Sequence, residues 1–348
     1  MPFENQLELN IRAFFFNAKT DYLPYYKNFS FVVNPEIRLK EILVMIKEQN
    51  SDFSYPDMDL LFRVNDFVVT GDKKISLIVD KLGKDLTIDP ALKFRSDNGL
   101  ILNNHDFMHQ FRRTVGHYAT KEDLAYYITL YPVHYASETF NYAHQYIGDA
   151  VLILAYKLIM DGNEHKDKIL DAINNDFCGI SCCEYENNVF EGEDYNEQID
   201  YLKKELRLRH KKSLIEMAKG ACLKKIRKEV TIDSLEGKKI ALYIGNRDSD
   251  TIATEGRKEI ESVGKFISFD MSTKLAGQTI LDINPTMTYQ KAGKMLLDAF
   301  DHGAEVLLFA KDEDSKFFNS IIAEVENEIG RPIELALMPL SELNAVEA

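Results

Sequence analysis

The sequence predicts a multidomain α+β protein: a small β-grasp unit, then an all-α domain, then an α/β domain with a mainly parallel sheet. Strand-like and helix-like segments are mixed in the first hundred residues, helical periodicity fills the middle of the chain, and strands alternate with helices toward its C-terminal end. The boundaries that fit these changes are residues 1–103, 104–230 and 238–348. With 348 residues, 45% of them hydrophobic, each domain can have a core of its own.

The first domain opens with a predicted β-hairpin. LELNIRAFFFN and KNFSFVVN are rich in aromatic and β-branched residues, and the turn-prone stretch KTDYLPYY separates them. A helix is expected in NPEIRLKEILVMIKEQN, where Asn34 can cap, Pro35 suits the first turn and apolar residues recur on one face. LLFRVND, ISLIVDKLG and DLTIDPAL are expected to add shorter strands. Two strands, a helix and further strands are the element order of a β-grasp fold.

The rest of the chain changes pattern twice. HDFMHQFRRTVGHY, KEDLAYYITLY, GDAVLILAYKLIMDG and HKDKILDAINNDF have helical periodicity or composition, as does the long stretch from Tyr195 whose basic part runs from Lys203 to Lys228. After a predicted linker around SLEGKK, the strand-like stretches KIALYIG, KFISFDM, AEVLLFA and IELALMPL alternate with helix-like segments. This β-α-β-α-β-α-β series predicts a mainly parallel sheet covered by helices.

The net charge and the N-terminal stretch limit the classes of function. A formal charge of -14 repels phosphate backbones, so the sequence disfavours a nucleic-acid partner. MPFENQLELN has no positively charged segment followed by an apolar run, and no segment approaches the ~20 apolar residues that cross a bilayer. Four cysteines do not form a disulfide framework, which fits a reducing compartment. We therefore expect a cytoplasmic protein without a transmembrane segment.

Three of the four cysteines, Cys178, Cys182 and Cys183, lie within the stretch FCGISCCEYE. Three thiolates with His144, His165 or a carboxylate would make a tetrahedral zinc site, iron is an alternative metal, and a thiol pair would make a redox centre. Adjacent cysteines are awkward ligands for one metal, because neighbouring side chains in regular structure point in different directions. We favour the interpretation that these are buried structural thiols or the remnant of a lost site.

A second candidate site lies in the third domain. Gly245, Asn246 and Arg247 follow the predicted strand KIALYI and precede a helix, so their backbone amides are candidates to hold an anion at a helix N-terminus. An ordinary turn would equally explain the glycine. His105 and His109 are four residues apart on a predicted helix but lack the glutamate of a zinc-protease motif. No G-x-S-x-G, Walker A or H-E-x-x-H motif occurs, so the sequence provides no catalytic residues and favours a non-enzymatic role.

Residues ~7–215 resemble the iron–sulfur subunit of succinate dehydrogenases and fumarate reductases. The resemblance rests on the collinear stretches IRAFFFN, FRVND, DLTIDPALKFRSDNGLILNNHDFMHQFR, YIGDAVLILAYKLIMDGNEHKDKILDAINNDF and EGEDYNEQIDYLKKEL. It implies a ferredoxin-like β-grasp domain of the two-iron type followed by an α-helical ferredoxin-like domain. It also implies a protein partner, the flavoprotein subunit of such a complex.

Nearly all cluster ligands of that family are missing here. Its first cluster needs cysteines before the FRVND strand, and SDFSYPDMDLL contains none. The ligand positions of its second cluster fall near Tyr126, Thr129, Pro132 and Ala136. Its third cluster would begin at Cys178, with Cys182 and Cys183 out of register. Because iron–sulfur clusters require thiolates, we expect no cofactor, with zinc or iron at the cysteine stretch as the alternative. The tyrosines of residues 123–148 are expected to fill the vacated volume as a closed core.

The third domain resembles the CCG domain of heterodisulfide reductases, through TYQKAGKMLLDAFDHGAEVLLFAKDEDSKFFNSII. In that family the strand ends in cluster-binding cysteines, whereas here it ends in Ala310, Lys311 and Asp312. Together the resemblances imply a cluster-free paralogue of an electron-transfer subunit that acts as an interaction, assembly or regulatory protein. Two alternatives remain open: a thiol- or metal-dependent redox protein using the three clustered cysteines, and a protein that binds a small anionic ligand through its C-terminal α/β domain.

Overall fold

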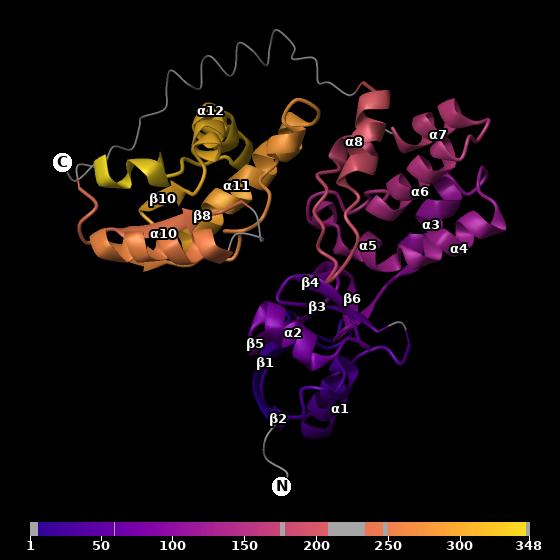
Figure 1. Ribbon diagram of the computed structural model, residues 1–348, viewed down its shortest axis with the longest axis horizontal. Helices are drawn as coiled ribbons and strands as arrows, with labels where there is room; N and C mark the ends of the chain where they lie inside the picture. The colour runs from indigo at the N-terminus through magenta and orange to yellow at the C-terminus, as the bar shows by residue number, and fades with distance from the viewer. Residues whose placement is uncertain (1–5, 59, 175–177, 208–233, 246–249, 346–348) are drawn as a thin grey trace. The chain divides into compact units, whose positions relative to one another are not determined.

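A computed structural model describes residues 6–58, 60–174, 178–207, 234–245 and 250–345 (Figure 1). The chain forms two compact units, of which the first comprises Met1–Ile180 and Tyr185–Leu206 and the second comprises Ser181–Glu184 and Arg207–Ala348. Both units contain helices and strands. The protein is therefore a multidomain chain of mixed α/β structure, as the sequence predicts. Cys222 and most of the basic stretch from Lys203 to Lys228 lie outside the described residues.

The first unit begins with a five-stranded mixed sheet. Its strands are β1 (Leu7–Phe15), β2 (Tyr25–Val33), β3 (Leu61–Val64), β4 (Phe67–Thr70) and β5 (Asp85–Pro90). They lie in the order β2-β1-β5-β3-β4, and β1 pairs with β5 in parallel. The antiparallel pairing of β1 with β2 runs from Leu7 opposite Val33 to Phe15 opposite Tyr25, which confirms the predicted hairpin.

Two helices pack on one face of this sheet, α1 (Leu39–Gln49) and α2 (Ile75–Leu82). Helix α1 starts later than predicted, because Asn34 caps a turn instead: its Oδ1 accepts a hydrogen bond from the Glu36 N–H at 2.9 Å. The prediction of a strand at ISLIVDKLG was wrong, since this stretch is α2. Its β-branched composition favoured a strand, but Ile75 and Ile78 are both buried at helical spacing, and the helix ends at Gly83 with φ 78°.

A short hairpin of β6 (Ser96–Asn98) and β7 (Ile101–Leu102) leads into the predicted helical region. Its helices are α3 (His105–Thr114), α4 (Lys121–Thr129), α5 (Tyr131–Ala136), α6 (Asp149–Met160), α7 (Lys166–Ile173) and α8 (Asn196–Glu205). Helix α6 is the most buried of these and contacts all the others. In the part of the chain that the structure describes, no helix is both long and apolar enough to cross a membrane.

The side chain of Arg63 on β3 joins the sheet to the helical region. Its guanidinium is buried, pairs with Glu138 at 2.6 Å, and donates to the backbone carbonyls of Ala91, Tyr135 and Ala136. Tyr135 and Ala136 form the last turn of α5, where carbonyls have no partner within the helix and carry partial negative charge. The arginine therefore satisfies a helix C-terminus and a carboxylate with one buried cation.

The second unit contains a four-stranded sheet in which every pairing is parallel. The strands are β8 (Lys239–Tyr243), β9 (Lys265–Ile267), β10 (Val306–Phe309) and β11 (Ala336–Pro339), in the order β11-β10-β8-β9. Helices α11 (Pro285–Asp301) and α12 (Asp312–Ile329) share one core with this sheet, and α10 (Asp250–Val263) packs into another. The predicted alternation of strands and helices and the parallel sheet are confirmed.

We predict that Arg63→Met lowers the free energy of unfolding by about 3–5 kcal/mol, because it leaves the buried carboxylate of Glu138 and several carbonyls unpaired. Urea unfolding followed by circular dichroism measures this loss. Arg38→Met is the control, since Arg38 pairs with Asp72 at an exposed position and its loss costs about 1 kcal/mol or less. Equal losses in the two variants would contradict a central role for Arg63.

Candidate functional site

The cysteine stretch is divided between the two units. Cys178 belongs to the first unit, where its carbonyl accepts a hydrogen bond from the Ile147 N–H at 3.0 Å, and Cys182 and Cys183 belong to the second. All three side chains are buried. Burial raises the pKa of the Cys178 thiol, although the charge of Arg113 opposes this effect. Cys178 is therefore a protonated thiol at neutral pH, and a protonated thiol is a poor nucleophile.

Among the described residues, one group of three potential ligands has its donor atoms within 4.8 Å of one another: Asp270, Asp298 and His302 in the second unit. None of the three clustered cysteines belongs to this group. Asp298 Oδ2 already accepts a hydrogen bond from the Met271 N–H at 2.8 Å, and His302 Nδ1 donates to the Asp298 carbonyl at 2.8 Å. Asp270 and His302 are exposed, and such groups are common on surfaces without a metal. We assign no metal site to them.

The predicted anion site falls partly outside the described residues, because Asn246 and Arg247 are not among them. Gly245 has φ 69°, and its N–H donates to the Ser272 carbonyl at 3.1 Å. A carboxylate oxygen of Asp314 would lie 3.2 Å from a Cβ at position 245. The Gly245 amide is thus used within the chain, beside the acidic side chain of Asp314.

Three of the six tyrosines in residues 123–148 are fully buried, and Tyr126, Tyr131 and Tyr142 are half-buried. Tyr127, Tyr135 and Tyr146 each have 0% of their surface exposed. Tyr127 stacks on Phe107, with ring centroids 4.3 Å apart. The three hydroxyls donate to the Phe107 carbonyl, Asp106 and Asp149, at 2.7–2.8 Å. Each buried phenol therefore has the hydrogen-bond partner that its burial requires.

Asp106, at the start of α3, is the polar centre of this aromatic core. It accepts hydrogen bonds from His134 Nε2 at 2.9 Å and from the Tyr135 hydroxyl at 2.8 Å, and it pairs with Arg95 at 3.0 Å. Burial alone would raise the pKa of Asp106, but the hydrogen bonds from His134 and Tyr135 and the charge of Arg95 outweigh burial and lower it. Gly148, at φ 92°, lets the backbone approach the His134 ring, since a Cβ there would lie 2.2 Å from Nδ1. These polar groups form a packed structural cluster.

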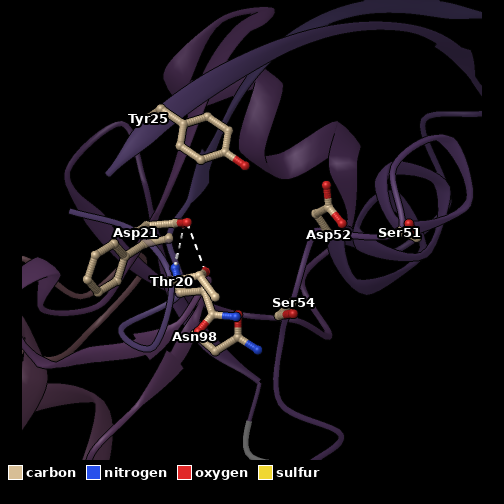
Figure 2. Close-up of a pocket in the computed structure, with 9 residues that line it drawn as sticks. Thr20, Asp21, Tyr25, Ser51, Asp52, Ser54 and Asn98 are labelled. Carbon is tan, nitrogen blue, oxygen red and sulfur yellow. Dashed lines mark hydrogen bonds between the residues drawn. The ribbon is translucent and has the colours of Figure 1, made fainter. Parts of the chain in front are cut away.

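A polar pocket of about 440 Å³ opens at the surface of the first unit (Figure 2). It lies where three segments meet: the β1–β2 connection, the stretch after α1, and β6. Its lining residues are Phe16, Asn17, Thr20, Asp21, Tyr25, Ser51, Asp52, Ser54 and Asn98. Figure 2 shows Asp21 and Asp52 on opposite sides, with the Tyr25 hydroxyl pointing between them.

The two carboxylates make this pocket acidic. Asp21 also shapes the loop, because its oxygens accept hydrogen bonds from the Asn17 N–H at 2.9 Å and the Thr20 hydroxyl at 3.0 Å. The Asp52 carboxylate has no hydrogen-bond partner among the described residues. Burial, Asp21 and Asp52, in that order, raise the pKa of Tyr25, so its hydroxyl stays protonated. Two carboxylates and a phenol suit an ammonium or guanidinium group that donates several hydrogen bonds.

Exposed apolar residues adjoin the pocket in the β1–β2 connection. Tyr22 is 96% exposed and Leu23 is 67% exposed, directly between the pocket residues Asp21 and Tyr25. Two lysines of the chain contact residues that line the pocket. Lys47 Nζ donates to the carbonyls of Ser51 and Phe53 at 2.7 and 2.6 Å, and Lys27 Nζ lies over the rings of Phe15 and Tyr25, 4.8 and 5.5 Å from their centroids. The pocket thus places two carboxylates beside an exposed apolar surface.

The sequence did not predict this pocket. Its residues come from three segments of the chain, with about thirty positions between the first and second and about forty between the second and third. Each segment alone is an ordinary polar stretch. The one available signal was the pair of exposed apolar residues in KTDYLPYY, because a turn at the surface normally carries polar residues.

Comparison with solved structures finds a distant likeness. A solved structure described as the crystal structure of a hypothetical protein from Helicobacter pylori matches at 17% sequence identity, covering 97% of this chain and 70% of that chain, with a TM-score of 0.45. A likeness at this level carries no argument about function. No protein-family model matches the chain, and no curated protein matches it.

We predict that the first unit loses stability in acid partly through Asp106. Because its pKa in the folded state is lowered, the stabilisation is complete above its ordinary pKa and is lost as the pH falls below about 4 through the folded value. Asp106→Asn should therefore lower stability at neutral pH but reduce the further loss on acidification. Melting temperatures at neutral and acid pH measure this. Asp97→Asn, at an exposed position on β6, is the control and should keep the full acid sensitivity of the native chain.

Proposed function

We propose that this protein is a cluster-free, non-catalytic paralogue of the iron–sulfur subunit of succinate dehydrogenases and fumarate reductases, and that it acts through protein interaction. In this proposal the first sheet, with two strands, a packed helix and the order β2-β1-β5-β3-β4, corresponds to the β-grasp domain. The helices from α3 to α8 correspond in this proposal to the α-helical ferredoxin-like domain. The parallel sheet of the second unit corresponds to the CCG-like domain.

The chemistry of the residues supports a role without clusters. The positions that align with second-cluster ligands lie among α4 and α5, beside the buried rings of Tyr127 and Tyr135. Neither phenols nor the surrounding carbonyls are the soft ligands that iron–sulfur clusters need. The residues present therefore do not fit such a cluster, and we derive no electron-transfer step from them.

The observation that carries the interaction role is the surface of the acidic pocket. We name this surface the loop patch: Asp21, Tyr22, Leu23, Tyr25 and Asp52. Large apolar side chains that stay exposed beside a concave site are typical of protein-binding surfaces, where an aromatic anchor and a pocket sit together. Ser51, Asp52 and Ser54 come from the stretch where the resembling family has the cysteines of its first cluster.

The loop patch favours a partner of a particular chemistry. A lysine or arginine side chain fits between Asp21 and Asp52, where two carboxylates and the Tyr25 hydroxyl can accept its hydrogen bonds. Tyr22 and Leu23 would then pack against apolar residues next to that basic side chain. The family resemblance gives the first candidate partner, the flavoprotein subunit of a succinate dehydrogenase or fumarate reductase complex.

We predict that chain purified without oxygen contains substoichiometric iron, zinc and acid-labile sulfide, because thiolates are missing at the aligned ligand positions. Elemental analysis and an absorption spectrum measure this, with a cluster-bearing iron–sulfur subunit prepared in parallel as the control. Stoichiometric metal that disappears in Cys178→Ser or Cys182→Ser would contradict the proposal and favour the redox alternative.

We predict that the purified flavoprotein subunit from the same host binds this chain, and that Asp52→Lys with Tyr22→Ser weakens binding at least about tenfold. The reversed charge repels the basic side chain, and the serine removes the aromatic anchor. Titration calorimetry measures the affinity.

The matched control is Asp57→Lys with Met58→Ser, which makes the same charge reversal and replaces another large exposed apolar residue by serine, at positions outside the pocket. It should bind as the native chain does. Absence of binding to the flavoprotein subunit would reject that partner, and equal weakening by both double variants would reject the loop patch as the docking surface.

A further inference from the structure

The second unit contains a buried carboxylate, that of Glu184, with hydrogen-bond donors around both oxygens. Glu184 is 1% exposed, and each of its two carboxylate oxygens accepts two hydrogen bonds. Oε2 accepts from the Gly277 N–H at 2.9 Å and from Lys291 Nζ. Oε1 accepts from the Thr279 N–H at 3.3 Å and from the Thr279 hydroxyl at 3.0 Å. Two backbone amides, a hydroxyl and an ammonium group thus surround one carboxylate.

The four donors belong to one continuous segment, and its local structure positions them. Gly277 has φ 93°, and a Cβ there would lie 2.7 Å from the Thr288 Cα, so only glycine allows this turn to press against α11. The Thr288 hydroxyl donates to the Gly277 carbonyl at 2.9 Å and holds the turn in place. Lys291 lies one helical turn after Thr288 on the same helix. The donors are therefore arranged by residues 277–291 themselves.

The carboxylate comes from elsewhere in the sequence. Glu184 is 93 residues from Gly277 and 107 from Lys291, and it belongs to a four-residue segment, Ser181–Glu184, within the second unit. This segment has another attachment at the start of α11, where Asn284 Nδ2 donates to Cys182 Sγ at 3.7 Å. The segment is thus bound at two points to the region that supplies the donors.

The energetics of such a pair argue for a binding site rather than a simple stabilising contact. A buried ion pair is weak grounds for stability, because the desolvation of two charges offsets their attraction, and apolar residues of equal volume serve as well. Charge-assisted hydrogen bonds from amides and a lysine are, by contrast, what recognition of a carboxylate requires. All four groups that recognise the carboxylate are in place at this turn.

We propose that Gly277, Thr279 and Lys291 form a carboxylate-binding site and that Glu184 is its ligand in cis. The ligand class is a carboxylic acid small enough to replace a glutamate side chain. In the native chain Glu184 fills the site and excludes free acids, because its carboxylate already occupies all four donors. This site is distinct from Gly245–Arg247 and independent of the proposed interaction role. It specifies which groups of the second unit recognise a carboxylate, and that in the native chain this carboxylate is Glu184.

The test is chemical rescue in the full-length chain. Glu184→Ala removes the atoms that acetate contains, so acetate should refill the site. We expect Glu184→Ala to lower the melting temperature by about 10 °C and excess acetate to restore about 5 °C of this loss. Acetamide, which has the same shape without charge, should restore much less. Acetate should leave the native chain unchanged, because Glu184 already fills the site.

The double variant Glu184→Ala/Lys291→Met separates recognition from a general salt effect. It lacks the ammonium group and should give no response to acetate. Equal shifts with acetate in the native chain, the single variant and the double variant would overturn the proposal, as would equal rescue by acetamide. If Glu184→Ala is insoluble, it is refolded from urea with acetate or with acetamide, and equal yields of folded protein overturn the proposal in the same way.

Discussion

The buried guanidinium of Arg63 is the interaction on which the first unit depends. A cation that cannot be deprotonated must find several acceptors once it leaves water, and here they come from both parts of the unit. Glu138 supplies charge, and the last turn of α5 supplies the carbonyls of Tyr135 and Ala136. The Ala136 carbonyl also accepts a hydrogen bond from Asn188 Nδ2, which holds the returning segment beside β4. Sheet and helices therefore share one polar centre, and neither can shift without leaving charge unpaired.

The second unit buries a charge of the opposite sign and also surrounds it with hydrogen-bond partners. Glu184 is a buried anion, and it is matched by donors from a glycine turn and by one lysine. In each unit a residue distant in sequence brings a charge to a place where backbone groups have no partner within secondary structure. The difference lies in the source of the partners: a helix C-terminus supplies carbonyls for the cation, and a turn before a helix supplies amides for the anion. In these two places the backbone polarity therefore matches the sign of the buried charge.

Periodicity made much of the fold predictable. The hairpin of β1 and β2 and the parallel sheet of the second unit follow from alternating or continuous apolar runs, which are local features. Helix α2 was wrongly predicted as a strand, because its β-branched residues favour strands. Only two of its residues, Ile75 and Ile78, are buried at helical spacing, which is a weak helical signal. The buried charged pairs could not be predicted from the sequence, for another reason. Arg63 and Glu184 are visible as residue types, but their partners lie 75 and 107 positions away, and no local pattern links them. The candidate pocket was missed for the same reason, since three segments that are distant in the sequence form it.

In the proposed ancestry, a buried cluster site and a surface cluster loop respond differently to the loss of their ligands. An interior that loses a cofactor must be refilled, because a cavity costs about 24 cal/mol for each Å³ that remains. In the proposed ancestry, the buried rings of Tyr127, Tyr135 and Tyr146 would fill that volume. A surface loop that loses its ligands has no such requirement, because water fills the space. There Asp52 and its neighbours form an open, charged hollow beside Tyr22 and Leu23. The same loss of cysteines would therefore close the interior and leave the surface loop available to a partner.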